Sequence, residues 1–173
     1  MRPPVLSRMS GSYIDKLLED ISKQILESVQ TMEWKGKVRM FFPNFFTFVQ
    51  VSDEFGIKAT QILSSSEFQL SHLMEKDDSP RTHISVMNST EQRQVPQWRA
   101  YQVRRKWHDW EVPFQIEKVQ IWVRTSNRTQ ERKLMCCLKI KSELIETIRM
   151  DLGCEPSSSH YNMHMMVSEK SIE

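Results

Sequence analysis

The order of helix-like and strand-like segments most constrains what this chain can fold into. Apolar residues recur at helical spacing between Ser12 and Met32, and Ser12 with Asp15 resembles a capping box. A helix is therefore predicted there, ending at Gly36. The runs KVRMFF and FFTFVQV are rich in aromatic and β-branched residues, and Pro43-Asn44 between them predicts a hairpin or a bent strand.

Further segments continue this order through the middle of the chain. Ser52-Asp53 is predicted to cap a second helix that carries Phe55 and extends toward Leu70 and Leu73. THISVMN and FQIEKVQIWV are predicted strands. In the second of these strands the apolar residues change phase near Lys118, which predicts a β-bulge.

The last third of the chain predicts a long helix and a final strand. Asn127 followed by Gln130 is expected to cap this third helix, and Gly153 is expected to end it. Cys136 and Cys137 then fall in the middle of the helix as small buried residues. The run HYNMHMMV predicts a short last strand. The side of that strand that docks on the sheet holds Tyr161, Met163, Met165 and Val167.

These segments do not alternate between strand and helix as a doubly wound fold requires. We therefore predict an α+β fold in which a mainly antiparallel sheet packs against three helices. A chain of 173 residues has the size of a single domain.

Composition argues against several classes of protein. The formal net charge is only +2, whereas domains that bind phosphate backbones are usually strongly basic. The three cysteines match neither a disulfide framework nor a zinc site, so reduced thiols and a cytosolic or nuclear location are expected. No apolar run is long enough to span a membrane, and the first residues do not resemble a signal peptide.

The sequence has no motif for catalysis or for cofactor binding. Its four glycines do not form a phosphate-binding loop, and its five histidines do not follow a metal-ligand spacing. On a strand, His160 and His164 share a face but lie about 13 Å apart, too far to chelate one metal. We therefore predict no enzyme activity, no catalytic residues, no small-molecule substrate, no metal and no cofactor.

Residues 95–114, VPQWRAYQVRRKWHDWEVPF, combine three of the five tryptophans with several basic side chains. One interpretation is a weak single-stranded nucleic-acid surface. Its basic residues are Arg99, Arg104, Arg105 and Lys106. A second interpretation is that the tryptophans are core residues, which suits Trp110 and Trp122, at or within a predicted strand. The third is an exposed anchor for a partner.

Trp98 is the residue that best fits an exposed anchor. It follows Pro96 in a polar segment without strand periodicity, so we predict that it lies on a loop. Large rigid aromatic side chains on loops are often binding anchors. The alternative is a tryptophan that folds back on the core.

Four segments, in order, resemble the autophagy-related protein 101 family, small HORMA-domain proteins of the autophagy-initiating kinase complex. WKGKV is similar to the end of the family's first helix, and FFTFVQVSDEF to its Phe-Thr-Tyr-Val strand and the helix start that follows. DWEV with FQIEKVQIWV resembles the family's Trp-Glu motif and central strand. RTQERKLMCCLKIKSELIETI resembles its long helix. Together they cover about two thirds of the chain.

The resemblance implies a single HORMA-like domain without catalytic activity that pairs with the HORMA domain of autophagy-related protein 13. It implies a core at residues 12–153, an N-terminal segment at 1–11 and a C-terminal belt or tail at 154–173. It further implies a cytoplasmic protein recruited to the phagophore assembly site. The alternatives are a HORMA-like adaptor of chromatin or meiotic complexes, or a weak single-stranded nucleic-acid binder.

The family also has a protruding loop, the WF finger with a Trp-Pro-Phe sequence, that recruits downstream factors. The comparable segment here is a finger loop at residues 89–106. The resemblance places Trp98 at the finger tryptophan, and Tyr101 is the candidate for the phenylalanine.

The family's partner-binding face implies Met32, Trp34, Phe46 and Phe48 at the corresponding positions. MFFPNFFTFV, with five phenylalanines in ten residues, is more apolar than one face of a short hairpin hides. Such an excess marks either an interaction surface or a phenylalanine-rich core.

Overall fold

A computed structural model describes most of the chain, with strands of one antiparallel sheet interspersed with five helices. The described residues are 11–64, 71–72, 82–126, 128–157 and 162–172. The prediction of an α+β fold is confirmed. Where three helices were expected, the described residues form five.

The first half of the chain follows the predicted order. The predicted end of the first helix at Gly36 is wrong, however, because the helix ends at Val29 and Gly36 lies in a strand, packed closely against Val49 and Gln50. Helix α1 (Gly11–Val29) leads into the hairpin of β1 (Lys35–Phe41) and β2 (Phe46–Gln50), and helix α2 (Glu54–Ser64) follows. Ser52 begins α2 as predicted, because its hydroxyl accepts a hydrogen bond from the Glu54 amide at 3.2 Å. The predicted extension of this helix to Leu70 and Leu73 lies outside the described residues.

The sheet joins strands from both halves of the chain. Its strand order is β5 (Glu111–Pro113), β1, β2, β4 (His83–Ser85), β8 (His164–Ile172), β7 (Arg132–Lys141) and β6 (Gln115–Thr125), and β3 (Ser71–His72) pairs with β8. Strand β8 lies between β4 and β7, so the segment predicted as a C-terminal belt or tail supplies a central strand. The register of β6 against β7 shifts between Ile116 and Lys118, which confirms the predicted bulge.

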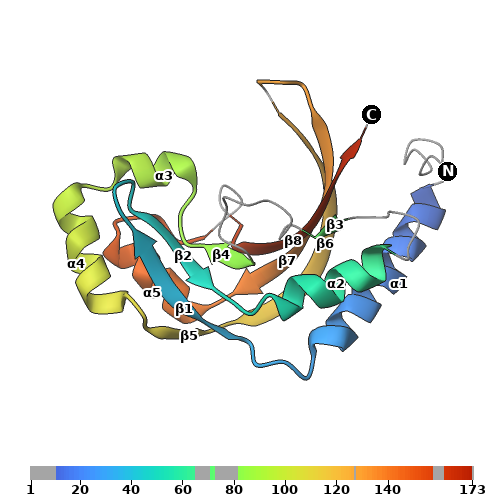
Figure 1. Cartoon of the computed structure of the whole chain (residues 1–173), viewed down its shortest axis with the longest axis horizontal. Helices are drawn as coiled ribbons and strands as arrows, with labels where there is room; N and C mark the ends of the chain where they lie inside the picture. The colour runs from blue at the N-terminus through green and yellow to red at the C-terminus, as the bar shows by residue number, and fades with distance from the viewer. Residues whose placement is uncertain (1–10, 65–70, 73–81, 127, 158–161, 173) are drawn as a thin grey trace.

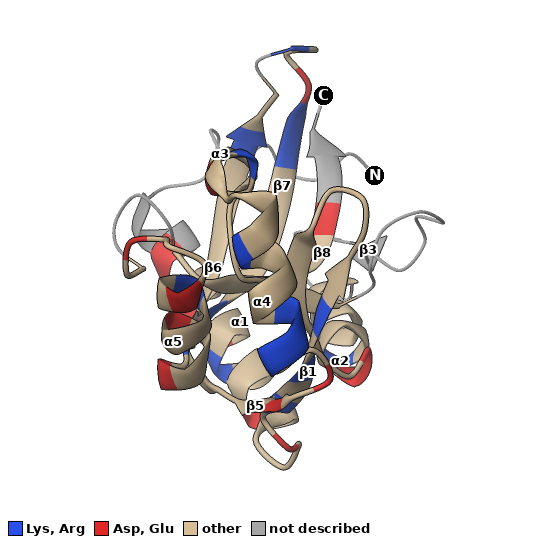
Figure 2. Cartoon of the chain, turned by 90° about the vertical axis from the view of Figure 1, so that its left-hand side faces the viewer, with Lys and Arg blue, Asp and Glu red and all other residues tan. Residues whose placement is uncertain are grey.

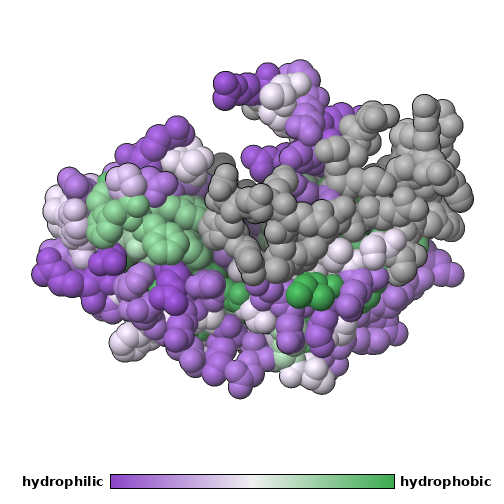
Figure 3. Space-filling view, in the orientation of Figure 1, coloured by the Kyte–Doolittle hydropathy of each residue, from purple (hydrophilic) through white to green (hydrophobic). Residues whose placement is uncertain are grey.

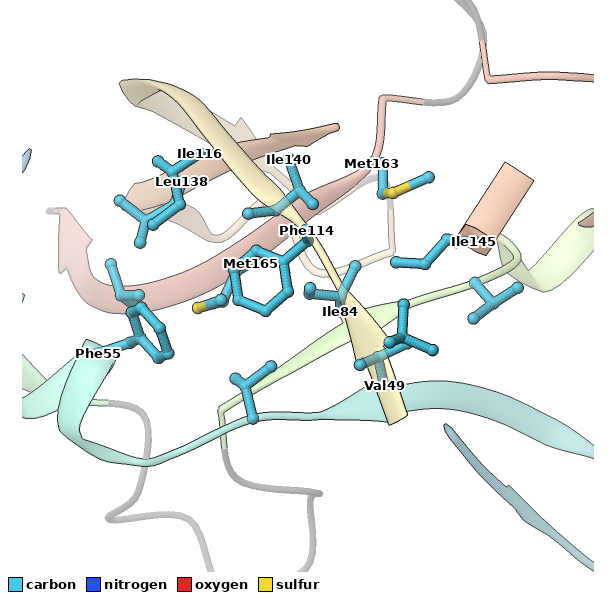
Figure 4. Close-up of a cluster of buried hydrophobic side chains, with 14 of the residues drawn as sticks. Val49, Phe55, Ile84, Phe114, Ile116, Leu138, Ile140, Ile145, Met163 and Met165 are labelled. Atoms are coloured by element: carbon cyan, nitrogen blue, oxygen red, sulfur yellow. The ribbon is translucent and has the colours of Figure 1, made fainter. Parts of the chain in front are cut away.

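The helices lie at opposite ends of the sheet. Figure 1 shows α1 and α2 side by side at one end and α3 (Ser89–Gln94), α4 (Gln97–Trp107) and α5 (Glu143–Asp151) at the other. Apolar side chains of the sheet and helices form one core, seen in part in Figure 4. Within it the rings of Phe55 on α2 and Phe114 before β6 lie 5.9 Å apart between centroids.

The predicted long third helix is wrong, because residues 132–141 form strand β7 and only residues 143–151 form a helix. Five consecutive residues, Leu134 to Leu138, are buried in β7. A strand covered on both faces has no alternation of apolar and polar residues, and its apolar run resembles a buried helix segment. Cys136 and Cys137 are buried as predicted, but in this strand.

The predicted finger loop at residues 89–106 is also wrong in its secondary structure. Asn88 and Glu91 form a capping box that starts α3, and Pro96 precedes the first turn of α4. Helix α4 buries Ala100, Val103 and Trp107, a spacing that follows one helical face. This stripe is narrow and surrounded by polar residues, so the segment was predicted as a loop.

Two other predictions are shortened or lie outside the described residues. The strand predicted for THISVMN spans only His83–Ser85, because Asn88 already caps the next helix. Of the predicted last strand, Met163, Met165 and Val167 are buried, and Met165 and Val167 lie in β8. Tyr161, His160 and the predicted cap Asn127 are outside the described residues.

Candidate functional site

Both residues predicted for the finger lie on helix α4 and are exposed. The side chain of Trp98 is 58% exposed and that of Tyr101 is 43% exposed. The guanidinium carbon of Arg99 lies 5.1 Å from the centre of the Trp98 ring, in a cation–π contact. Trp98 is therefore exposed and not folded back on the core. It lies on a helix, however, and not on the predicted loop.

Tyr101 joins two aromatic rings from the turn between β1 and β2. Its ring centroid lies 5.1 Å from that of Phe42 and 5.4 Å from that of Phe45, and the two phenylalanine rings are 4.9 Å apart. The guanidinium of Arg104, one turn further along α4, lies 4.8 Å above the Phe42 ring. We name these four residues the turn–helix cluster.

The backbone of the turn directs Phe45 into this cluster. Phe45 has a φ of 57°, in the left-handed region that favours glycine and disfavours bulky side chains. The side-chain oxygen of Asn44 accepts a hydrogen bond from the Phe46 amide, and the Asn44 carbonyl accepts one from the Gln92 side chain at 2.7 Å. The turn is thus tied to α3 as well as to α4.

Helix α4 is fixed to the domain through its buried face. The indole nitrogen of Trp107 donates a hydrogen bond of 2.8 Å to Asp151 at the end of α5, and Lys106 forms an ion pair with the same carboxylate at 3.1 Å. Ala100 and Val103 are almost fully buried beneath the same helix. The opposite face, which carries Trp98 and Tyr101, is left in solvent.

A buried arginine connects α3 and α5. Arg149 is 1% exposed, and its guanidinium donates to Glu91 at 3.0 and 2.7 Å and to the carbonyls of Val86 and Glu155. Burial raises the pKa of Glu91, but the hydrogen bonds from Arg149 and the Asn88 backbone outweigh it, so the net pKa lies below the ordinary value. We name this pair the Arg149 clamp.

Phe46 and Phe48, predicted for partner binding, form a second aromatic group on β2. Their rings stack at 5.1 Å, and Phe48 also contacts the ring of Phe41 at 5.5 Å and that of His83. Phe48 is only 2% exposed, whereas Phe41 is 53% exposed. Phe41 therefore supplies the accessible surface of this group, and Phe48 supports it from below.

Met32 and Trp34, the other residues predicted for partner binding, lie at the opposite end of β1. Both are half-buried against the core, and the Trp34 indole donates a hydrogen bond of 3.0 Å to the Val29 carbonyl. Phe46 pairs with Phe41 at the far end of the strand. Seven strand residues span roughly 20 Å, so the four predicted residues do not form one site.

The charged residues on the last turn of α4, beside the turn–helix cluster, are all basic: Arg104, Arg105 and Lys106. Figure 2 marks the basic positions along the ribbon of α4. Arg39 pairs with Asp109 and Lys106 with Asp151, so these charges are compensated. Within the part of the chain that the structure describes, Arg104 and Arg105 form no ion pair. The Nε atom of Arg104 is buried without a hydrogen-bond partner there.

Sequence reasoning missed Phe42, Phe45 and Arg104 as members of a site with Tyr101. The phenylalanine-rich run MFFPNFFTFV was the available signal, since it has more aromatic side chains than a hairpin face hides. It did not show that α4 packs beside the turn. That proximity depends on contacts between segments about 60 residues apart in the chain, which no local pattern encodes.

Within the described ranges, the thiols and histidines show no arrangement typical of a catalytic or metal centre. Burial raises the pKa of Cys136 to about 12, and burial together with the Glu91 charge raises that of Cys154 to about 11, so both remain protonated at neutral pH. Burial and the neighbouring Arg104 and Arg39 lower the pKa of His108. Among the described residues, no three His, Cys, Asp or Glu side chains are grouped to hold a metal ion.

Comparisons with protein-family models, with curated proteins and with solved structures find no match to this chain. None of the helices in the described ranges is long and apolar enough to cross a membrane. The surface around α4 therefore has to be interpreted from its own geometry and chemistry.

Proposed function

We propose that this protein is a non-enzymatic adaptor of the autophagy-initiating kinase complex. In this proposal it has a HORMA-like domain, pairs with the HORMA domain of autophagy-related protein 13, and recruits downstream factors to the phagophore assembly site from the cytoplasm. Trp98 and Tyr101 act as its finger. Met32, Trp34 and Phe46 contribute to HORMA-partner binding at separate points, and the buried Phe48 supports Phe46 from beneath.

The exposure of Trp98 is the observation that supports this proposal most. The Trp98 indole is 58% exposed, so it contributes little to the core. The buried face of α4 fixes the helix that carries it. Tryptophan is among the residues most enriched at binding hot spots, because it buries a large area with little loss of entropy. Of the four resembling segments, FFTFVQVSDEF has the strand and helix start that the resemblance implies. WKGKV leads into strand β1 instead of ending a helix, and FQIEKVQIWV forms β6 at the edge of the sheet.

The fourth resembling segment departs from the family pattern. RTQERKLMCCLKIKSELIETI resembles a long helix, but strand β7 and the short helix α5 form there. The proposal does not use this segment for pairing or recruitment. It depends on the first helix, the β1–β2 hairpin and helix α4.

Coexpression with the HORMA domain of autophagy-related protein 13 tests the pairing. The expected result is co-elution of the two chains in size-exclusion chromatography. If they never co-elute and this chain is a stable lone monomer, the adaptor function is wrong.

Substitution of Trp98 tests the finger. Trp98→Ala is expected to leave pairing intact and to reduce recruitment of a downstream factor to autophagosome formation sites, measured by fluorescence microscopy. Trp110→Ala is a matched control, because Trp110 is 54% exposed but lies beyond α4. Equal recruitment by both variants would assign Trp98 a structural role only.

A further inference from the structure

The surface at the turn–helix cluster is apolar and open. Figure 3 shows hydrophobic side chains gathered on the side of the molecule where α4 and the β1–β2 turn lie. Phe42 and Tyr101 are each 43% exposed, and both pack on Phe45. Rings that pack on one another and still face solvent form a contiguous apolar patch, which is typical of an interaction site.

The cluster includes a cation placed to bind a carboxylate. The Arg104 guanidinium stacks on Phe42, and a stacked guanidinium keeps its N–H donors at its edge. Its Nε is buried and has no hydrogen-bond partner among the described residues. The Arg104 side chain as a whole is only half-buried, so a partner's carboxylate would reach the guanidinium through its solvent-facing N–H groups.

The charges nearby favour an acidic partner over a neutral one. Arg105 is exposed and Arg104 half-buried, and neither has an ion pair in the described part of the chain. Asp109, just beyond the end of α4, and Asp151, which contacts α4, are already paired with Arg39 and Lys106. A ligand with carboxylates therefore meets uncompensated positive charge around the rings.

We propose that the turn–helix cluster binds a short acidic peptide segment of a partner protein, with a bulky apolar side chain on Phe42, Phe45 and Tyr101 and a carboxylate on Arg104. The proposal rests on the proposed function because it includes Tyr101 of the finger. It goes further by adding the β1–β2 turn to the binding surface and by assigning the chemistry of the partner.

An acidic peptide fits the surface better than a single-stranded nucleic acid does. Successive bases need ring faces open for stacking and a line of cations for the phosphates. Here Arg104 covers one face of the Phe42 ring, and the rings of Phe42 and Phe45 contact each other nearly edge-on, at 79°, so they do not form a series of parallel stacking faces. The formal net charge of +2 also gives little attraction for phosphates.

Selection of random dodecapeptides displayed on phage, against the purified chain alone, tests the proposal. The expected result is a consensus with Asp or Glu beside an aromatic or large aliphatic residue. A consensus without an acidic residue, or no consensus at all, would overturn it. Because no HORMA partner is present, failure here is distinct from failure of co-elution.

Variants then locate the binding of one selected peptide, measured by fluorescence anisotropy. Arg104→Gln and Phe42→Ser are each expected to raise the peptide's Kd by about tenfold or more. The first removes a charge-assisted hydrogen bond, and the second removes a ring that the peptide buries. Arg128→Gln and Ile57→Ser are matched controls, since Arg128 and Ile57 are exposed elsewhere. Equal loss in the variants and their controls would refute the site.

Two further measurements keep the test decisive if a variant fails to fold. Replacing the acidic residue of the peptide with Gln, with the unaltered protein, is expected to weaken binding by about tenfold. A labelled oligothymidine is expected not to compete with the peptide at low salt. If oligothymidine competes, the ligand of this surface is a nucleic acid and not an acidic peptide.

Discussion

Two groups of aromatic rings in this protein have opposite surroundings. Phe55 and Phe114 contact each other in the core, and both are at most 4% exposed. Phe42 and Tyr101 contact each other as closely, but each is 43% exposed. Ring contact alone therefore does not show whether an aromatic group stabilises the fold or remains available for a partner. Solvent exposure and the charges around the rings make that distinction.

The largest expected effect comes from truncating an interior ring. Phe55→Ala is expected to lower the free energy of unfolding by about 4 kcal/mol, because it leaves a cavity in a core that cannot fill it. The same truncation at Phe42 is expected to change it by only about 0.5 kcal/mol. Urea unfolding followed by circular dichroism measures both. Comparable losses at the two positions would show that the turn–helix cluster belongs to the core.

A smaller effect is expected from breaking the Arg149 clamp. Arg149→Met is expected to destabilise the fold by about 3 kcal/mol, because Glu91 loses its charged partner and two backbone carbonyls lose a donor. Arg105→Met, at an exposed position on α4, is the control and is expected to be nearly neutral. Equilibrium unfolding in urea measures the difference in the free energy of unfolding. If Arg149→Met does not change it, the Arg149 clamp does not hold α3 in place.

The smallest effect is expected from acid. The pKa of Glu91 is lower in the folded chain than its ordinary value of 4.5, so in acid the unfolded chain binds more protons. The stability from this carboxylate is fully present above that value and is lost as the pH falls through the lower folded pKa. Glu91→Gln is expected to flatten this part of the pH dependence in unfolding experiments between about pH 5 and pH 3. An unchanged pH profile would contradict the assignment.

The elements that were predicted correctly are those with local signals in the sequence. Helix α1 has a clear periodicity, the β1–β2 hairpin has aromatic and β-branched runs on both sides of Pro43-Asn44, and α2 has a serine at its start. Strand β7 is buried on both faces, and local patterns do not distinguish such a strand from a buried helix. Helices α3 and α4 have mostly polar surfaces, and only Ala100, Val103 and Trp107 indicate a buried side.

For the candidate site, the sequence indicated its members only one at a time. Trp98 was predicted as exposed because no periodicity requires its burial, and the structure agrees while placing it on a helix. Tyr101 was predicted by resemblance alone. Phe48 was predicted at a partner surface but is buried, because it lies beneath Phe41 and Phe46 on the hairpin.

The sequence by itself determined the α+β class, the position of the hairpin and the bulge in β6, because each depends on the spacing of neighbouring residues. Only the tertiary structure decided that the C-terminal strand β8 lies between β4 and β7. It also brought Tyr101 and Arg104 against Phe42 and Phe45. Such contacts join distant segments, and they form because the core beneath them fixes α4 beside the β1–β2 turn.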